Sequence, residues 1–289
     1  EEAEKYLEES EQIFEDYHKT TKREEIEEKG AQVNKFIAGL KKLSLPLQRI
    51  LVKKALWDAK KVCEKTNNVE AALWATMPQF AIVHTLKEAS APELIINFMD
   101  KSNDREFRYL CMESFYGPKD SVAVEPLITV MIDSTDKLRG QACKILGLIE
   151  NKRAVEPMVN LYWKGQMRED VVWSLGIIGD KRAYDVLMDG LENGDPKLKG
   201  SCIIALGGIG DKRAVPKLIE ILESKKDVKI KHHGSLKARV MIALGEIGDE
   251  RAVPALMKIL KHKDHYYRYQ ASKAGTARSS PISPRAIIT

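Results

Sequence analysis

Side chains able to do chemistry are few and scattered in this sequence. His232 and His233 stand side by side, and two histidines can hold a metal ion when further ligands follow. No carboxylate or thiolate follows them at ligand spacing. The sequence has four cysteines: Cys63, Cys111, Cys143 and Cys202. They lack the close pairing of a metal or redox site, so we interpret them as small buried residues of a reducing compartment, and we predict no metal and no cofactor.

A row of cations stands at one recurring position of the sequence. Its members are Arg108, Arg139, Arg168, Lys199, Lys237 and Arg268. An aspartate precedes three of them by four residues, at Asp104, Asp195 and Asp264. We expect an internal ladder, in which each cation bonds an aspartate and turn carbonyls of neighbouring units. A row of phosphate contacts is the alternative.

Signatures of catalysis are missing. The sequence has no glycine-rich phosphate loop, no Gly-x-Ser-x-Gly elbow and no Cys-His pairing of the nucleophilic type. A carboxylate that could serve a repeat-built glycosylase is Asp170, three residues before Trp173. The sequence therefore names no catalytic residue, and we lean against an enzyme.

The element that must position these side chains is a repeat. The alanines of the Arg-Ala-Val motif fall into register at Ala123, Ala154, Ala183, Ala214 and Ala252, with Ala91 as a weaker copy. The spacings are 32, 31, 29, 31 and 38 residues. A period in this range is typical of stacked helix pairs, in which each unit buries its apolar face only against its neighbours.

Each unit predicts two helices joined by a polar turn. The first begins at Ala-Val-x-x-Leu, and the second ends at Ala-Leu-Gly-x-Ile-Gly-Asp, as in residues 205–211. The last glycine suits a left-handed C-cap, and the aspartate after it can cap the next helix. Small residues at the crossings, Gly147, Gly176, Gly207 and Gly245, predict close approach of successive second helices.

The segments GDKRAVPKLIEIL, PKLKGSCIIALGGIGD and GDERAVPALMKIL resemble HEAT-type repeats of the phycobilisome-lyase-like class, over roughly residues 91–275. The resemblance implies an all-α, right-handed alpha-alpha superhelix. It implies little about activity, since the class includes scaffolds, lyases and a metal hydroxylase. The hydroxylase members carry paired His-Glu dipeptides, which this chain lacks, and this argues against a di-iron oxygenase.

The sequence predicts three regions. Residues 1–88 read as a helical N-terminal cap without the repeat consensus, or as a separate helical module. Residues 89–275 hold about six helix pairs, with an insertion at 225–235 between the two helices of one unit. Residues 276–289 contain Pro281 and Pro284 and predict an extended or disordered tail.

The second helices of such solenoids usually line the concave side, where polar residues are expected. The residues just before the Ala-Leu-Gly alanine position are Glu113, Lys144, Trp173, Ile204, Ile242 and Lys273. Three apolar residues, Trp173, Ile204 and Ile242, form a stripe in adjacent units, extended by Leu148 and Ile177. Exposed stripes of this kind mark partner sites. Lys144 and Lys273 at its flanks suit an acidic-apolar peptide or helix; the alternative is that the stripe is core.

The insertion is basic. Its cations, with those that follow it, are Lys225, Lys226, Lys229, Lys231, Lys237 and Arg239. A solvated loop is one interpretation, and contact with nucleic acid or an acidic protein is the other. The insertion has no aromatic residue for base stacking, which weakens the interpretation as a single-strand binder.

Composition limits the remaining choices. The chain of 289 residues is 44% hydrophobic and 31% charged, and its longest apolar run is too short to span a bilayer. Residues 1–30 hold 12 acids and five bases, a balance of −7 within a total of +5. We predict a cytoplasmic, non-enzymatic scaffold or adaptor that binds a protein or peptide in its concave groove. The alternatives are a nucleic-acid binder using the inner cations and the 225–239 loop, and a lyase- or hydroxylase-like enzyme with an unrecognised site.

Overall fold

The computed structural model describes residues 2–18, 38–65, 92–100, 102–115, 121–224, 228–230, 234–261 and 265–275, with short stretches at 31–32, 35–36, 76, 79–83 and 85–86. The chain forms two compact units. One contains residues 1–116 and 120–127, and the other contains residues 117–119 and 128–289. Within the predicted N-terminal cap, residues 19–30 and 66–75 lie outside the described residues, as does the predicted tail 276–289.

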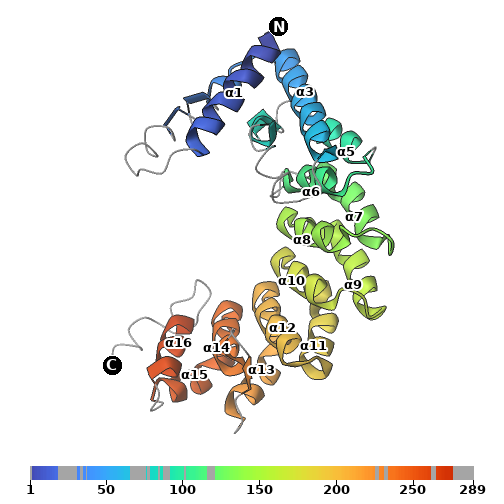
Figure 1. Cartoon of the computed structure of the whole chain (residues 1–289). Helices are drawn as coiled ribbons and strands as arrows, with labels where there is room; N and C mark the ends of the chain where they lie inside the picture. The colour runs from blue at the N-terminus through green and yellow to red at the C-terminus, as the bar shows by residue number, and fades with distance from the viewer. Residues whose placement is uncertain are drawn as a thin grey trace. The chain divides into compact units, whose positions relative to one another are not determined.

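The first unit is built around a long central helix (Figure 1). Its helices are α1 (Glu2–His18), α3 (Leu45–Glu64), α5 (Pro92–Asp100) and α6 (Arg105–Glu113), followed by the short 3₁₀ turn η1 (Ser121–Ala123). Helix α3 packs against α1, α5 and α6 and buries one face, including Leu51 and Leu56. Ser44 lies at the N-cap position of α3 in extended backbone, but its side chain makes no cap bond, and Pro46 occupies the first turn.

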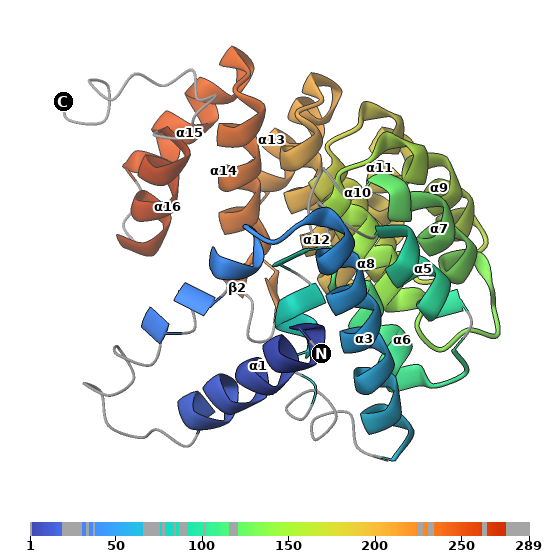
Figure 2. The ribbon, with the colours of Figure 1, turned by 90° about the horizontal axis from the view of Figure 1, so that it is seen from above.

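The second unit alternates first and second helices. The first helices are α7 (Val124–Ile132, which starts in the first unit), α9 (Val155–Trp163), α11 (Tyr184–Asn193), α13 (Val215–Glu223) and α15 (Val253–Leu260). The second helices are α8 (Arg139–Ile149), α10 (Arg168–Ile178), α12 (Pro196–Ile209), α14 (Leu236–Ile247) and α16 (His265–Gly275). Figures 1 and 2 show two layers, with α8, α10, α12, α14 and α16 on the inside of this unit's curve. The unit is an all-α solenoid, as the sequence predicts.

Short 3₁₀ turns lead from each second helix to the next first helix: η2 (Lys152–Ala154), η3 (Lys181–Ala183), η4 (Lys212–Ala214) and η5 (Glu250–Ala252). The preceding C-caps are left-handed at Gly179, Gly210 and Gly248, with φ of 69°, 62° and 67°. The aspartate after each glycine accepts a hydrogen bond from the main-chain N–H two residues later, as Asp180 does from Arg182 at 3.0 Å. The predicted glycine and aspartate caps are confirmed. In the first copy Glu150 replaces the glycine at φ 57°.

Successive second helices touch through small residues. A Cβ built on Gly147 would lie 2.9 Å from Ser174 Cα, and one on Gly176 would lie 2.7 Å from Ala205 Cβ. Real Cβ atoms do not approach so closely, so any larger side chain at these positions would push the helices apart. This close stacking joins the second helices into one continuous inner layer.

The insertion holds a small piece of strand structure. Strand β1 (Lys229–Ile230) pairs antiparallel with β2 (Gly234–Ser235) in the register Lys229 to Ser235. Ser235 then caps α14 by accepting a hydrogen bond from Ala238 N at 3.1 Å. The described part of the insertion therefore includes a two-stranded antiparallel ribbon.

Candidate functional site

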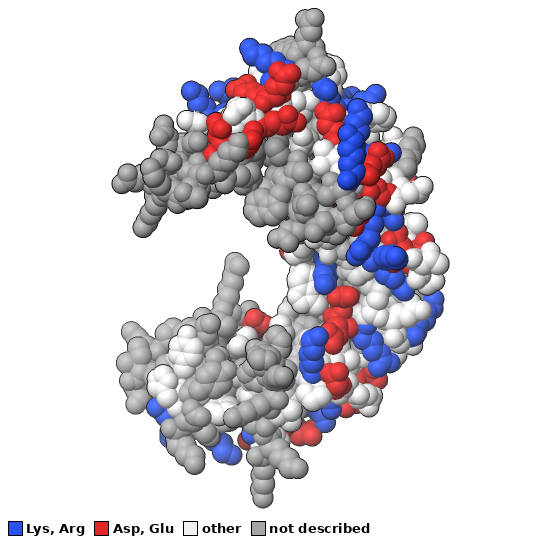
Figure 3. All heavy atoms as spheres, viewed as in Figure 1, with Lys and Arg blue, Asp and Glu red and all other residues white. Residues whose placement is uncertain are grey.

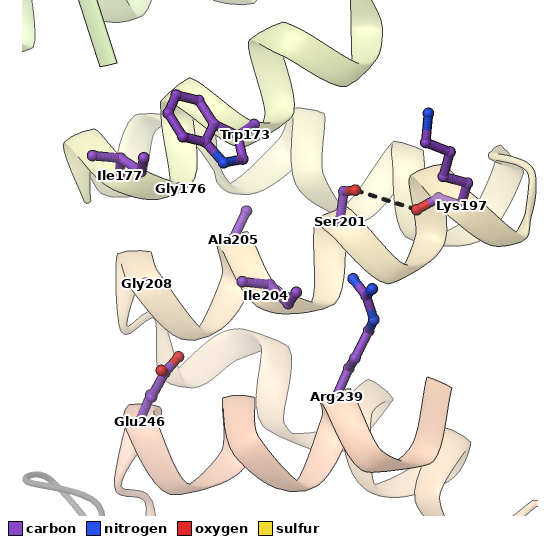
Figure 4. Close-up of a pocket in the computed structure, with 10 residues that line it drawn as sticks. All are labelled: Trp173, Gly176, Ile177, Lys197, Ser201, Ile204, Ala205, Gly208, Arg239 and Glu246. Carbon is purple, nitrogen blue, oxygen red and sulfur yellow. Dashed lines mark hydrogen bonds between the residues drawn. The ribbon is translucent and has the colours of Figure 1, made fainter. Parts of the chain in front are cut away.

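A groove crosses three second helices in the second unit. It has a volume of about 360 Å³. Its lining comes from α10, α12 and α14: Trp173, Gly176, Ile177, Lys197, Ser201, Ile204, Ala205, Gly208, Arg239 and Glu246. Figure 4 shows these residues on three neighbouring helices, with Arg239 and Glu246 pointing from α14 toward α12. The groove belongs to the inner layer of the repeats.

Apolar side chains and small residues make up the middle of the groove. Trp173 is 44% exposed and Ile204 48% exposed, although both are large and apolar. Ile177 is half-buried beside them. Gly176 and Ala205 lie between these side chains (Figure 4), where the close packing of α10 on α12 leaves only main chain and a methyl group. A bound apolar side chain would contact the helices directly at this point.

The two ends of the groove carry opposite charges. Lys197 lies near the start of α12 and Arg239 near the start of α14, whereas Glu246 lies near the end of α14. Lys197 Nζ already pairs with Glu169 Oε2 at 2.6 Å. Glu246 lies against α12, close enough that a Cβ on Gly207 would meet its Oε2 atom. Partial desolvation there raises the pKa of the Glu246 carboxyl.

The other residues predicted for this site fall in several places. Lys144 is exposed on α8, but its Nζ lies 3.4 Å from Asp170 Oδ1, so the proposed steering cation already has a carboxylate beside it. Leu148 and Ile242 are half-buried and are not among the described residues that line the groove. The side chain of Lys273 lies outside the described residues. The structure thus brings together Trp173, Ile177 and Ile204, and adds Arg239 and Glu246 at the groove's ends.

Two members of the row of cations, Arg139 and Lys199, bond carbonyl oxygens at the end of the preceding first helix. Arg139 Nε donates to Met131 O at 3.1 Å, and its Nη2 donates to Gln166 Oε1 at 2.9 Å. Lys199 Nζ donates to Glu192 O at 3.0 Å. Because helix C-termini expose unpaired carbonyls of partial negative charge, these contacts cap the first helices.

The prediction that these cations pair with aspartates is wrong for Lys199, which bonds a carbonyl oxygen instead. The aspartates at positions 104 and 195 act as N-caps. The carboxylates of Asp104 and Asp195 accept hydrogen bonds from Phe107 N at 2.7 Å and Leu198 N at 2.8 Å. Both aspartates are therefore N-caps of their own second helices. Sequence spacing does not separate the two roles, because an aspartate four residues before a cation fits either one.

An inter-repeat ladder does exist, at a different arginine. Arg182 Nη2 donates to Lys152 O at 2.9 Å, 30 residues earlier, and Arg251 Nη2 donates to Lys212 O at 2.9 Å, 39 residues earlier. Each guanidinium also bonds the aspartate two residues before it. The sequence signal for these contacts is the arginine of the recurring Asp-x-Arg-Ala motif, whose aspartate alone was assigned a role as a cap.

The basic insertion is described only in part. Lys225, Lys226 and Lys231 lie outside the described residues, as does the side chain of Lys229. Lys237 Nζ donates a hydrogen bond to Ser224 O, and Arg239 lines the groove. Figure 3 shows Lys and Arg interspersed with Asp and Glu among the described residues on the face that it presents.

Burial protects the cysteines from reaction. All four are free and buried. Desolvation raises the pKa of the Cys63, Cys143 and Cys202 thiols to about 12, and that of Cys111 well above its ordinary value. Near neutral pH these thiols are protonated and supply no nucleophile.

Metal-binding clusters and membrane-spanning helices are both absent from the described residues. No cluster of three or more His, Cys, Asp or Glu in the described part of the chain could hold a metal ion. Among the described helices, none is both long and apolar enough to cross a membrane.

The alternating helix pairs, their Gly-Asp caps and the continuous inner layer define a helical-repeat solenoid. The sequence model of HEAT repeats matches residues 124–197, 165–233 and 185–274, which together cover more than half of the chain. The chain belongs to the HEAT-repeat family. No curated protein matches it in sequence.

Several solved structures are similar to the chain, among them a lyase complex, an engineered protein and a hydroxylase. The complex of CpcE and CpcF of phycocyanin lyase from Nostoc sp. PCC7120 is 25% identical, over 64% of this chain and 75% of that one, with a TM-score of 0.46. An engineered protein is 16% identical, over 96% and 81%, with a TM-score of 0.47. Human deoxyhypusine hydroxylase in complex with glycerol is 15% identical, over 79% and 97%, with a TM-score of 0.32. At these scores the three likenesses support no argument about activity.

Proposed function

We propose that this HEAT-repeat chain is a non-enzymatic scaffold or adaptor that binds a segment of a partner protein in the groove across α10, α12 and α14. The observation that carries the proposal is the pair of large apolar side chains, Trp173 and Ile204, which stand exposed on adjacent second helices beside a floor of small residues. Solvent disfavours this arrangement, and a partner that covers it gains the burial of both side chains.

A selection from random peptides tests the proposal, and the natural partner need not be identified first. Random 12-residue peptides displayed on phage are selected on the immobilised chain, and the enriched peptides are synthesised with a fluorophore. Their affinity is then measured by fluorescence anisotropy for the wild type, Trp173→Ala and Ile204→Ala. We expect each variant to weaken binding about ten-fold or more, because groove-centre anchors carry most of an interface's free energy.

Trp163→Ala is the matched control. Trp163 is also exposed, at 52%, but lies at the end of α9 in the layer of first helices. Its removal should leave peptide affinity unchanged, and thermal melts should show that all three variants remain folded. If the selected peptides bind Trp173→Ala, Ile204→Ala and the wild type equally, the groove is not the site.

A nucleic-acid partner is the less favoured interpretation. Lys144 and Lys197 stand beside carboxylates, and Lys199 and Lys237 bond main-chain carbonyls, so these cations already have partners within the described chain. Affinity for duplex and single-stranded DNA at 50 and 200 mM salt would separate the two interpretations. Strong binding that falls steeply with salt would favour nucleic acid.

The described side chains give no support to an enzymatic function. The Cys143 thiol is buried and protonated, and Asp170, the carboxylate considered for a glycosylase, lies beside Lys144. The four free cysteines fit the reducing cytoplasm, which we propose as the compartment.

A further inference from the structure

We infer that the segment bound in the groove is basic and apolar: an apolar side chain lies against Trp173 and Ile204, and a Lys or Arg next to it pairs with Glu246. This inference rests on the proposed function and adds the chemistry of the partner. It departs from the acidic-apolar segment that the sequence suggests, because Lys144, one of the two lysines expected to select an acid, stands beside Asp170. The side chain of the other, Lys273, lies outside the described residues.

Glu246 is placed where its carboxylate can form an ion pair with a bound ligand. Within the described part of the chain its carboxylate makes no hydrogen bond and no ion pair, unlike the nearby Glu169 and Asp170, which lie beside lysines. The carboxylate rests against α12 at Gly207, where a Cβ would collide with Oε2. Glycine at this position therefore gives Glu246 its place at the rim of the groove.

The surroundings of Glu246 increase its preference for a cation. Glu246 is exposed as a residue, but its Oε2 atom rests against α12, and this partial desolvation raises the pKa of the carboxyl. Removing a carboxylate from water costs free energy unless a positive partner replaces the lost hydration. A guanidinium or ammonium group supplies that partner and forms a charge-assisted hydrogen bond, while its aliphatic stem packs on the apolar middle of the groove.

The distance between the two ends of the groove limits where the basic residue lies in the ligand. Arg239 stands seven residues before Glu246 on α14, a separation of about 10 Å along the helix axis. Lys197 lines the same end as Arg239, where it is paired with Glu169. A ligand cation is attracted at the other end, by Glu246. In an extended segment about three residues span this distance, so the basic residue lies within about three positions of the residue nearest Arg239.

The test repeats the 12-residue phage selection on the wild type, Glu246→Gln and Glu246→Lys. We expect wild-type peptides to combine apolar residues with a Lys or Arg at a fixed offset. A peptide selected on the wild type should bind Glu246→Gln about ten-fold more weakly, as loss of a charge-assisted hydrogen bond predicts. Selection on Glu246→Lys should enrich Asp or Glu at the same offset.

Glu250→Gln is the matched control, since Glu250 is an exposed glutamate in η5, outside the groove. It should leave both the selected motif and the affinity unchanged. Peptides that depend on Trp173 but bind Glu246→Gln as well as the wild type would overturn the basic-apolar inference and leave the proposed function standing. A selection without any Trp173-dependent peptide would overturn both. Melting curves of each variant exclude loss of fold as the cause.

Discussion

The guanidinium of Arg182 bonds the carbonyl oxygen of Lys152 at 2.9 Å, across 30 residues of sequence. The same guanidinium bonds the carboxylate of Asp180, whose Oδ1 also caps the 3₁₀ turn η3. One carboxylate therefore orients the arginine that ties this repeat to the one before it. The arrangement recurs at Arg251, Asp249 and Lys212. In these two copies an Asp-x-Arg-Ala motif thus sets both the local turn and the contact between repeats. In the copy between them Arg213 bonds Asp211 and lies over the ring of Tyr184, 4.0 Å from its centroid.

Asp180→Ala should destabilise the fold by about 1–2 kcal/mol, because it removes an N-cap and releases Arg182 from its inter-repeat bond. Urea unfolding monitored by circular dichroism measures the change. Lys181→Ala, next to it in the same exposed turn, is the control and should stay within about 0.5 kcal/mol of the wild type. Equal effects of the two substitutions would show that the Asp180 carboxylate has no special role.

Acid should weaken the fold through these same aspartates. Hydrogen bonds from the Arg251 side chain and main chain lower the pKa of Asp249 from 3.8 to about 2, and the pKa values of Asp180 and Asp211 are lowered in the same way by Arg182 and Arg213. A carboxyl with a lowered folded-state pKa stabilises the fold above its unfolded-state value. That contribution is lost as the pH falls from about 4 to about 2.

The chain supplies its own control for this pH dependence. Asn151 occupies the aspartate position of the first copy and still accepts a hydrogen bond from Arg153 N at 3.0 Å. Asp249→Asn should therefore keep the cap and lose the titration, so its melting temperature should fall less between pH 4 and pH 2 than that of the wild type. An equal fall in melting temperature between pH 4 and pH 2 for the two proteins would show that Asp249 does not contribute to the acid sensitivity of the fold.

Local signals in the sequence were sufficient for the fold because each repeat is set by its own residues. Glycine at the C-cap, aspartate after it and small residues at the crossings act within one turn or one helix contact. The left-handed C-cap at Gly179, the cap bond at Asp180 and the close helix contact at Gly176 each depend on short-range geometry. Because the motif recurs about six times, an error in the interpretation of one copy does not change the predicted architecture.

The candidate site was only partly predictable because it depends on the register between helices. Trp173 and Ile204 could be assigned to the inner layer from one repeat position. Glu246 could not, since its approach to α12 depends on how α14 crosses that helix at Gly207. The partners of Lys144 and Lys197 likewise come from α10, one helix away, and no spacing within a single unit reports them.

Glu150 is the weak C-cap of the repeats. It adopts a left-handed φ of 57° where the later copies use glycine. Because a Cβ is unfavourable in this region, Glu150→Gly should stabilise the fold by about 1 kcal/mol. The reverse experiment, Gly179→Ala at φ 69°, should destabilise it by a similar amount. Denaturant unfolding measures the change in the free energy of unfolding for both variants. A loss of stability in Glu150→Gly would show that the glutamate side chain stabilises the fold by more than its left-handed backbone destabilises it.

Gly176 tests the close contact of α10 with α12, on which the floor of the groove depends. A Cβ there would lie 2.7 Å from Ala205 Cβ and 2.8 Å from Ala205 Cα, so Gly176→Ala forces the two helices apart and should destabilise the fold by about 1–3 kcal/mol. Gly39 provides the control, since it also lies in helical backbone but a Cβ there meets nothing within 4 Å. Gly39→Ala should therefore stabilise the fold by about 0.5–1 kcal/mol through helix propensity alone. Urea unfolding measures the change in the free energy of unfolding for both variants. Changes of opposite sign would assign the destabilisation to the contact between α10 and α12. Stabilisation by both substitutions would mean that the two helices accommodate the added methyl group without loss of stability.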